Sequence, residues 1–142
     1  MEAAFWDSSS LVPLCVTQQG SPGAQALSQR YNMIVWWAAA VEIRGAAARL
    51  LRMGLLTSNQ QVGARVRLEG LRSIWREITP TSTLRDQAEQ LLDRFPLKAA
   101  DALQLAAALA WCSGRPRGRG FISADVQLLG VARQLGFQVF GI

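Results

Sequence analysis

The chain has 142 residues, half of them hydrophobic and 18% charged, so it can bury one sizeable core and is too apolar for a disordered tail. Histidine is absent, which excludes Ser-His-Asp and Cys-His hydrolases in their usual form and zinc sites ligated by histidine. Fifteen basic residues, all arginine except Lys98, against ten acidic ones give a net charge of +5 and favour an anionic partner, with nucleic acid first.

The first half of the chain alternates short apolar runs with helical patterns. Residues 3–6 form an apolar run that ends at Asp7 and a serine cluster, which is typical of a buried strand leading into a helix. Residues 33–37 predict a second strand, and the alanine-rich residues 38–53 predict a helix. The other elements expected in this half are helices over residues 11–16, 24–31 and 59–73, the last one capped by Ser58, and a strand over residues 74–78.

The second half continues the alternation. Pro80 marks the start of a helix that runs to about residue 94, and a second alanine-rich helix over residues 98–112 follows the break at Pro96. The remaining elements are a strand over residues 121–123, a helix over residues 125–135 and a last strand over residues 138–140. Because strands alternate with helices, the pattern predicts an α/β fold with three α/β/α layers around a mostly parallel sheet.

Three features bear on where the protein resides. Cys15 and Cys112 form neither a disulfide framework nor a CxxC motif, so we expect two buried thiols in a reducing compartment. The N-terminus carries Glu2 and Asp7 without an early positive charge, unlike a signal peptide. The longest apolar run, residues 33–41, is far shorter than the roughly 20 residues that a membrane-spanning helix needs. We therefore expect a cytoplasmic protein without a membrane partner.

Four acidic residues lie close to the ends of the predicted strands, where ligands collect in parallel α/β sheets. Asp7 ends the first strand, and Glu42 lies one helical turn beyond the second. Asp125 follows the strand over residues 121–123, and Asp101 lies in the first turn of the alanine-rich helix. Only alanine and glycine lie three and four residues from Glu42, so no cation can pair with it on the helix surface.

Each of these acids also has a plain structural explanation. Asp7 and Asp125 can cap helices, Asp101 can interact with a helix dipole for roughly 0.3–1 kcal/mol, and Glu42 can be exposed to solvent. Four such residues at one edge are harder to explain in this way, because packed carboxylates repel one another and an unpaired buried charge is unfavourable. A hard divalent cation, Mg²⁺ or Mn²⁺, resolves the conflict because both accept oxygen ligands.

The blocks that contain these acids resemble PIN-domain ribonucleases, specifically the VapC-type toxins of bacterial type II toxin–antitoxin pairs. Residues 5–12 match the opening D-x-[ST] block, residues 41–46 the central glutamate block, residues 96–108 the DALxLAAA helix and residues 121–125 the last [ST]-x-D block. The blocks occur in the family's order across essentially the whole chain. One departure is Gln104, where many relatives carry histidine at a position that is not a metal ligand in the family pattern.

The resemblance implies one PIN domain over residues 1–142, with a Rossmann-like fold and a central sheet of four to five strands. It implies a Mg²⁺- or Mn²⁺-dependent endoribonuclease that hydrolyses RNA in line and leaves a 5′-phosphate and a 3′-hydroxyl. The catalytic carboxylates, which would also be the ligands of one or two metal ions, are Asp7, Glu42, Asp101 and Asp125. Ser9 and Ser123 would orient carboxylates or a bound water, and Asp101 or Asp125 would help to deprotonate that water.

The resemblance also implies two protein partners: a cognate VapB-like antitoxin that holds the toxin inactive, and a second copy in a homodimer. For the RNA, seven arginines against the single acid Glu69 lie between residues 44 and 76, in the helices beside the acidic site. We expect Arg44 and Arg49 to bind the RNA backbone, the alternative being that these arginines serve helix propensity and solubility. The arginine-rich loop over residues 115–119 is expected at the opposite end of the sheet.

Two other interpretations compete with the ribonuclease. A catalytically silent PIN-fold module that binds RNA or acts as a scaffold would share the fold, although the presence of all four acids argues against it. A different enzyme with an acidic pocket, such as a phosphatase or a response-regulator-like phosphoacceptor, is disfavoured. No DxD motif follows the first strand, and no aspartate follows the third.

Overall fold

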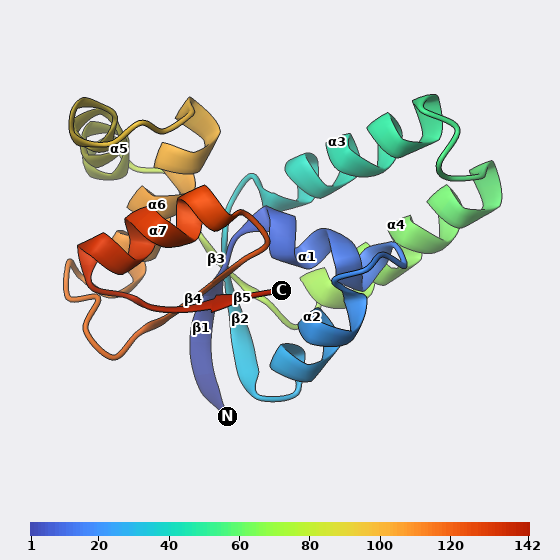
Figure 1. The fold of residues 1–142 in the computed structure, drawn as a ribbon, viewed down its shortest axis with the longest axis horizontal. Coiled ribbons are helices and arrows are strands. Elements are labelled where there is room, and N and C mark those ends of the chain that lie inside the picture. The colour runs from blue at the N-terminus through green and yellow to red at the C-terminus, as the bar shows by residue number, and fades with distance from the viewer.

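The computed structural model describes residues 1–142 and contains one fully parallel sheet of five strands with helices on both faces (Figure 1). The strands are β1 (Glu2–Trp6), β2 (Tyr31–Trp36), β3 (Arg76–Ile78), β4 (Gly120–Ser123) and β5 (Gln138–Gly141). Their order is β3-β2-β1-β4-β5, so the chain builds outward from β1 on one side and then crosses to the other. The predicted three-layer α/β/α fold is confirmed, with five parallel strands.

The seven helices divide between the two faces of the sheet (Figure 1). One face carries α1 (Ser8–Cys15), α2 (Ser21–Ser28), α3 (Ala39–Arg52) and α4 (Ser58–Arg72), and the other carries α5 (Ser82–Arg94), α6 (Ala99–Trp111) and α7 (Val126–Leu135). Helices α3 and α4 form a hairpin that projects away from the sheet. None of the seven is both long and apolar enough to cross a lipid bilayer.

Side chains of β1 alternate between the two halves of the core, as a strand buried on both faces requires. Phe5 stacks on Phe121 at 5.5 Å between ring centroids, on the face covered by α6. Ala4 and Trp6 face α1 and α3. The alanines of α6 let that helix approach the sheet closely, and the two cysteines are free and buried, as expected. Since β1 is the middle strand, paired with β2 on one side and β4 on the other, Asp7 lies at the centre of the sheet edge.

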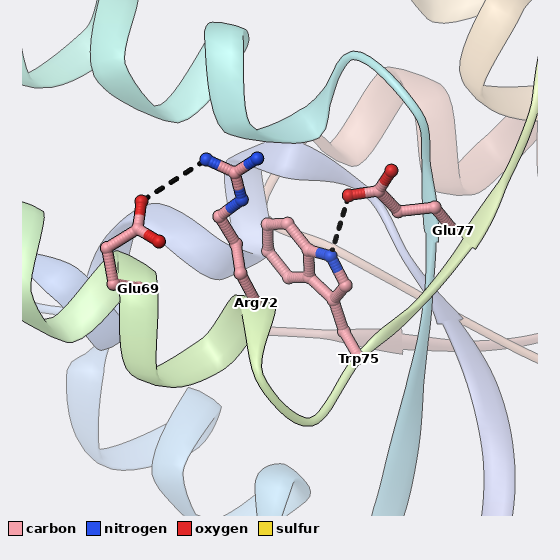
Figure 2. Close-up of polar contacts among 4 residues, drawn as sticks. All are labelled: Glu69, Arg72, Trp75 and Glu77. Atoms are coloured by element: carbon pink, nitrogen blue, oxygen red, sulfur yellow. Dashed lines mark hydrogen bonds and ion pairs between the residues drawn. The ribbon is translucent and has the colours of Figure 1, made fainter.

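Polar contacts hold the connection between α4 and β3 (Figure 2). The guanidinium of Arg72 lies 3.2 Å from the Glu69 carboxylate, and this is the only ion pair in the chain. The buried Trp75 donates its indole N–H to Oε2 of Glu77 at 3.0 Å. The ion pair lies within the last turn of α4 and is exposed, whereas the Trp75 bond lies within the segment that leads into β3.

Several predicted boundaries are wrong. The strand expected over residues 74–78 begins only at Arg76, and the helix expected to start at Pro80 begins at Ser82, with Thr81 as its cap. The helix expected over residues 24–31 is α2, which begins earlier because Pro22 is favoured in a first helical turn, and Tyr31 instead starts β2 by pairing with Glu2. Helix α1 begins at Ser8, immediately after Asp7. The cap of α4 is Thr57 and not Ser58, because Thr57 and Gln60 exchange two hydrogen bonds in a capping box.

Candidate active site

The four predicted acids lie at the carboxyl edge of the sheet, around the point where the strand order reverses. Asp7 directly follows the central strand β1, and Asp125 follows the neighbouring strand β4 and caps α7. Glu42 lies in the first turn of α3, and Asp101 in the first turn of α6. The side chains therefore come from both helical layers, and the sheet edge between them is where a ligand of this fold class binds.

Asp7 is the most deeply buried of the four, with 4% of its surface exposed. Its Oδ2 accepts hydrogen bonds from Ser9 Oγ and from Ser123 Oγ, the latter at 2.8 Å. Both hydroxyls are held in turn by successive backbone amides, because the N–H groups of Ala124 and Asp125 donate to them at 3.0 Å. These amides occupy acceptor positions on the hydroxyl oxygens and so favour donation of the hydroxyl protons towards the carboxylate.

Helix capping accounts for the position of Asp125 but not for that of Asp7. The Asp7 side chain makes no capping bond to α1, so its burial has no helix-capping cause. Oδ1 of Asp125 accepts from the backbone N–H of Leu128 at 3.1 Å and does cap α7. Capping uses only one oxygen of Asp125, so a capping role and a ligand role are compatible in this residue.

Glu42 is held by two residues that the sequence did not identify as part of a site. Its Oε1 accepts from Ser8 Oγ at 3.1 Å and from Gln104 Nε2 at 2.8 Å. A signal for Gln104 existed: it is a lone amide in an alanine-rich helix, three residues after Asp101 and thus on the same helix face. Ser8 carried no such signal, because it looked like one of three equivalent serines at a helix start.

Three of the four carboxylates, those of Asp7, Glu42 and Asp125, are anchored through one oxygen each. The hydrogen bonds found for them end on Oδ2 of Asp7, Oε1 of Glu42 and Oδ1 of Asp125, and Asp101 accepts no side-chain hydrogen bond. None of the four forms an ion pair. The arrangement combines fixed carboxylates with free oxygens, and oxygen ligands of this kind are what Mg²⁺ and Mn²⁺ prefer.

Burial and mutual repulsion disfavour the charged forms. Burial raises the pKa of Asp7, of Glu42 and of Asp101 above their ordinary values. The charge of Asp101 raises the pKa of Asp7 and of Glu42 further, and the charge of Asp125 raises the pKa of Asp101. Lys98 opposes the last effect only in part. The four acids thus share one unfavourable field of negative charge, which a cation would relieve.

No group of three or more acidic or cysteine side chains stands in position to hold a metal ion. The donor chemistry fits Mg²⁺ or Mn²⁺, because the site offers only oxygen atoms, their charges are uncompensated and at least three of the carboxylates keep an oxygen free of side-chain bonds. The assignment of Asp7, Glu42, Asp101 and Asp125 as metal ligands therefore stays a prediction.

The two arginines expected to bind RNA lie on different sides of α3. Arg49 is seven residues after Glu42, nearly two helical turns, so the two share a side of the helix. Arg44 faces α4 instead. It lines a cavity of about 390 Å³ whose other walls are Val62, Arg65, Val66, Leu68 and Glu69.

No protein-family model matches the sequence, and no curated protein sequence matches it significantly. Solved structures match its fold over nearly the whole length. A toxin–antitoxin complex from Klebsiella pneumoniae matches with a TM-score of 0.66 and 17% identity, over 99% of this chain and 100% of that one. VapBC2 from Rickettsia felis matches with a TM-score of 0.67 and 10% identity, over 97% of this chain and 98% of that one. FitAcB from Neisseria gonorrhoeae matches with a TM-score of 0.64 and 15% identity, over 97% of this chain and 96% of that one.

At identities this low, the likeness establishes the fold. The chain has the PIN-like α/β/α architecture expected from its sequence blocks. Its acidic residues occupy the carboxyl edge of that sheet, the place where the architecture gathers ligands.

Proposed function

We propose that this chain is a metal-dependent endoribonuclease and the toxin of a VapBC-type toxin–antitoxin pair. The observation that carries the proposal is the group of uncompensated carboxylates at the reversal point of a PIN-like sheet, three of them anchored through a single oxygen: Asp7, Glu42 and Asp125, with Asp101 beside them. RNA is the proposed substrate, because the basic chain favours an anionic polymer and the sequence blocks resemble ribonucleases.

Bound Mg²⁺ or Mn²⁺ would neutralise charge on the phosphodiester and lower the pKa of a water nucleophile. Asp7, Glu42, Asp101 and Asp125 would hold the cation, and Ser9 and Ser123 keep the Asp7 carboxylate in place. Asp101 or Asp125 would accept the proton of the attacking water. The water oxygen would bond to phosphorus as the bond to the 3′ oxygen breaks, and that oxygen would take up a proton from solvent, leaving a 5′-phosphate and a 3′-hydroxyl.

The protein partner that we propose is an antitoxin. Two of the matched structures are a toxin–antitoxin complex and VapBC2, which supports a partner of this class. The cavity between α3 and α4 is a suitable docking site, because Val62 and Val66 are more than half exposed and Arg44 and Arg65 make no ion pair. An antitoxin segment that carries aliphatic and acidic side chains would bind there. A short reading frame just upstream should encode it, and co-purification of the two chains tests the pairing.

We also propose a homodimer, following the same resemblance. Sedimentation equilibrium of the isolated chain measures this directly, and a monomer at all concentrations contradicts it.

The activity is tested with total RNA and Mn²⁺. We expect the wild type to cleave and Asp7→Asn to lose activity by about 100-fold or more, because the variant lacks a charged carboxylate at the centre of the site. The matched control is Asp86→Asn, which removes an exposed acid of α5 and should cleave like the wild type. The proposal is contradicted if the wild type and Asp7→Asn both cleave the RNA, or if neither does. Cleavage by the wild type that is undiminished in EDTA also contradicts it.

A catalytically silent PIN-fold module that binds RNA or acts as a scaffold is the second candidate. It would share the PIN-like fold and the arginine-rich α3–α4 hairpin, which suit RNA binding without catalysis. Isothermal titration with Mn²⁺ distinguishes the two candidates. Binding by the wild type and its loss in Asp7→Asn favour the nuclease, whereas a wild type that does not bind Mn²⁺ favours the silent module.

A further inference from the structure

Gln104 places an amide inside one of the most apolar parts of the molecule. Its side chain is 1% exposed, and the next five residues of α6, through Leu109, are all buried and apolar. An amide in such surroundings is unfavourable unless its polar groups find partners. In Gln104 only the amide nitrogen finds partners. Nε2 donates two hydrogen bonds, whereas Oε1 is buried without a hydrogen-bond partner.

The orientation of the amide follows from the chemistry of its neighbour. Nε2 lies 2.8 Å from Oε1 of Glu42, and an ionised carboxylate can only accept a hydrogen bond. Turning the amide over would bring two acceptor oxygens together. The carbonyl oxygen of Gln104 must therefore point away from Glu42, and it stays unpaired as the consequence of the bond that Nε2 makes.

Ser8 completes a triangle of hydrogen bonds with these two residues. Gln104 Nε2 donates to Ser8 Oγ at 2.8 Å, and Ser8 Oγ donates to the same Oε1 of Glu42 at 3.1 Å. The triangle joins α1 and α3, on one face of the sheet, to α6 on the other. Since both bonds to Glu42 end on Oε1, they orient the carboxylate and leave its Oε2 without a side-chain partner.

We propose that Gln104 is a positioning residue, whose Nε2 holds Oε1 of Glu42 so that Oε2 is presented to a divalent cation. The inference rests on the proposed function, in which Glu42 is a metal ligand. Gln104 is not itself a ligand in this scheme, because the group that it turns to the site is an amide N–H. A role in packing alone explains the burial of Gln104 but not its unpaired oxygen, since an aliphatic side chain would fill the same space without it.

The test uses Gln104→Met, which keeps the length and apolar bulk of the side chain and removes both polar groups of the amide. We expect the Mn²⁺ dissociation constant, measured by isothermal titration on the full chain, to rise by about 10–100-fold. The melting temperature in EDTA should change little, because the loss of the two Nε2 hydrogen bonds is offset by the removal of the unpaired carbonyl. The matched control is Leu105→Met, a neighbouring buried residue without polar contacts, which should keep the wild-type dissociation constant.

The outcomes separate the inference from the function on which it rests. A folded Gln104→Met that binds Mn²⁺ like the wild type overturns the positioning role and leaves the proposed nuclease intact. A wild type that does not bind Mn²⁺ overturns the proposed function, and the positioning role with it. If Gln104→Met does not fold, Ser8→Ala takes its place, since it removes the second hydrogen bond to the same oxygen. It should weaken Mn²⁺ binding in the same direction, and an unchanged dissociation constant overturns the inference.

Discussion

At the scale of single residues, Asp7 shows two opposing effects on one carboxyl group. Burial raises its pKa, and the charge of Asp101 adds to the rise, whereas the hydroxyls of Ser9 and Ser123 lower it. Burial is the largest effect, so the folded protein without a cation holds this carboxylate at a loss of stability. The charged Asp7 side chain therefore does not stabilise the metal-free fold at neutral pH.

The first prediction is that Asp7→Asn stabilises the metal-free protein at neutral pH. The ordinary pKa of this aspartate is 3.8, and the folded value is raised. Its favourable contribution is therefore complete below about pH 3.8 and is lost as pH rises through the folded pKa. In EDTA at pH 7 the variant should melt several degrees above the wild type, and the difference should shrink on acidification. A variant that melts lower at pH 7, or a gap that widens towards acid, contradicts the prediction.

The position of the four acids at one edge of the sheet could be predicted from sequence, but the residues that hydrogen-bond to them could not. Each acid stood out because it followed an apolar run or lay among small residues, a local pattern that needs no knowledge of distant contacts. Gln104 and Ser8 act through Glu42, from 62 and 34 residues away along the chain. Only the fold brings α6, α1 and α3 together, so no local pattern could reveal the triangle.

At the scale of secondary-structure elements, the sheet was predictable in kind and less so at its boundaries. Residues 33–37 were expected as the second strand from their apolar run, yet β2 starts at Tyr31 because that residue pairs with Glu2 of β1. Such pairing is a tertiary effect, which a local apolar pattern does not register. The capping box of α4 shows the reverse case, since Thr57 and Gln60 could have been recognised from their spacing alone.

The second prediction concerns the packing of β4 between its neighbours. A Cβ on Gly120 would lie 3.0 Å from Cβ of Ala4 in β1 and 3.3 Å from the ring of Phe140 in β5. Gly120→Ala should therefore destabilise the fold by about 1–3 kcal/mol, measured by urea denaturation. Gly70→Ala in α4 is the matched control, because nothing lies within 4 Å of its Cβ and alanine favours a helix, so it should stabilise by about 0.5–1 kcal/mol. Equal effects at both positions contradict the packing argument.

At the scale of the whole molecule, basic residues occupy both ends of the sheet. Beside the acids lie the arginines of the α3–α4 hairpin, and at the amino edge lies the loop over residues 115–119, which precedes β4 (Figure 1). That loop is packed against the body, with Pro116 close to Gly136 and the Arg119 guanidinium 5.5 Å from the ring centre of Trp111. Its position agrees with the expectation from sequence, because α6 starts at the acidic edge and runs away from it.

The third prediction uses this separation to locate the RNA. Arg49 shares the side of α3 that carries Glu42, whereas Arg117 is exposed at the opposite end of the sheet. If the backbone of the RNA passes the carboxylates, Arg49→Gln should weaken RNA binding and lower the slope of affinity against salt by about one phosphate contact. Arg117→Gln removes the same charge from the chain, so it serves as the control and should leave the slope unchanged. Filter binding at several salt concentrations in Ca²⁺ or EDTA, without cleavage, measures both variants. Equal losses would show that net charge alone attracts the RNA, and a loss confined to Arg117→Gln would place the RNA at the wrong edge for the carboxylates to act on it.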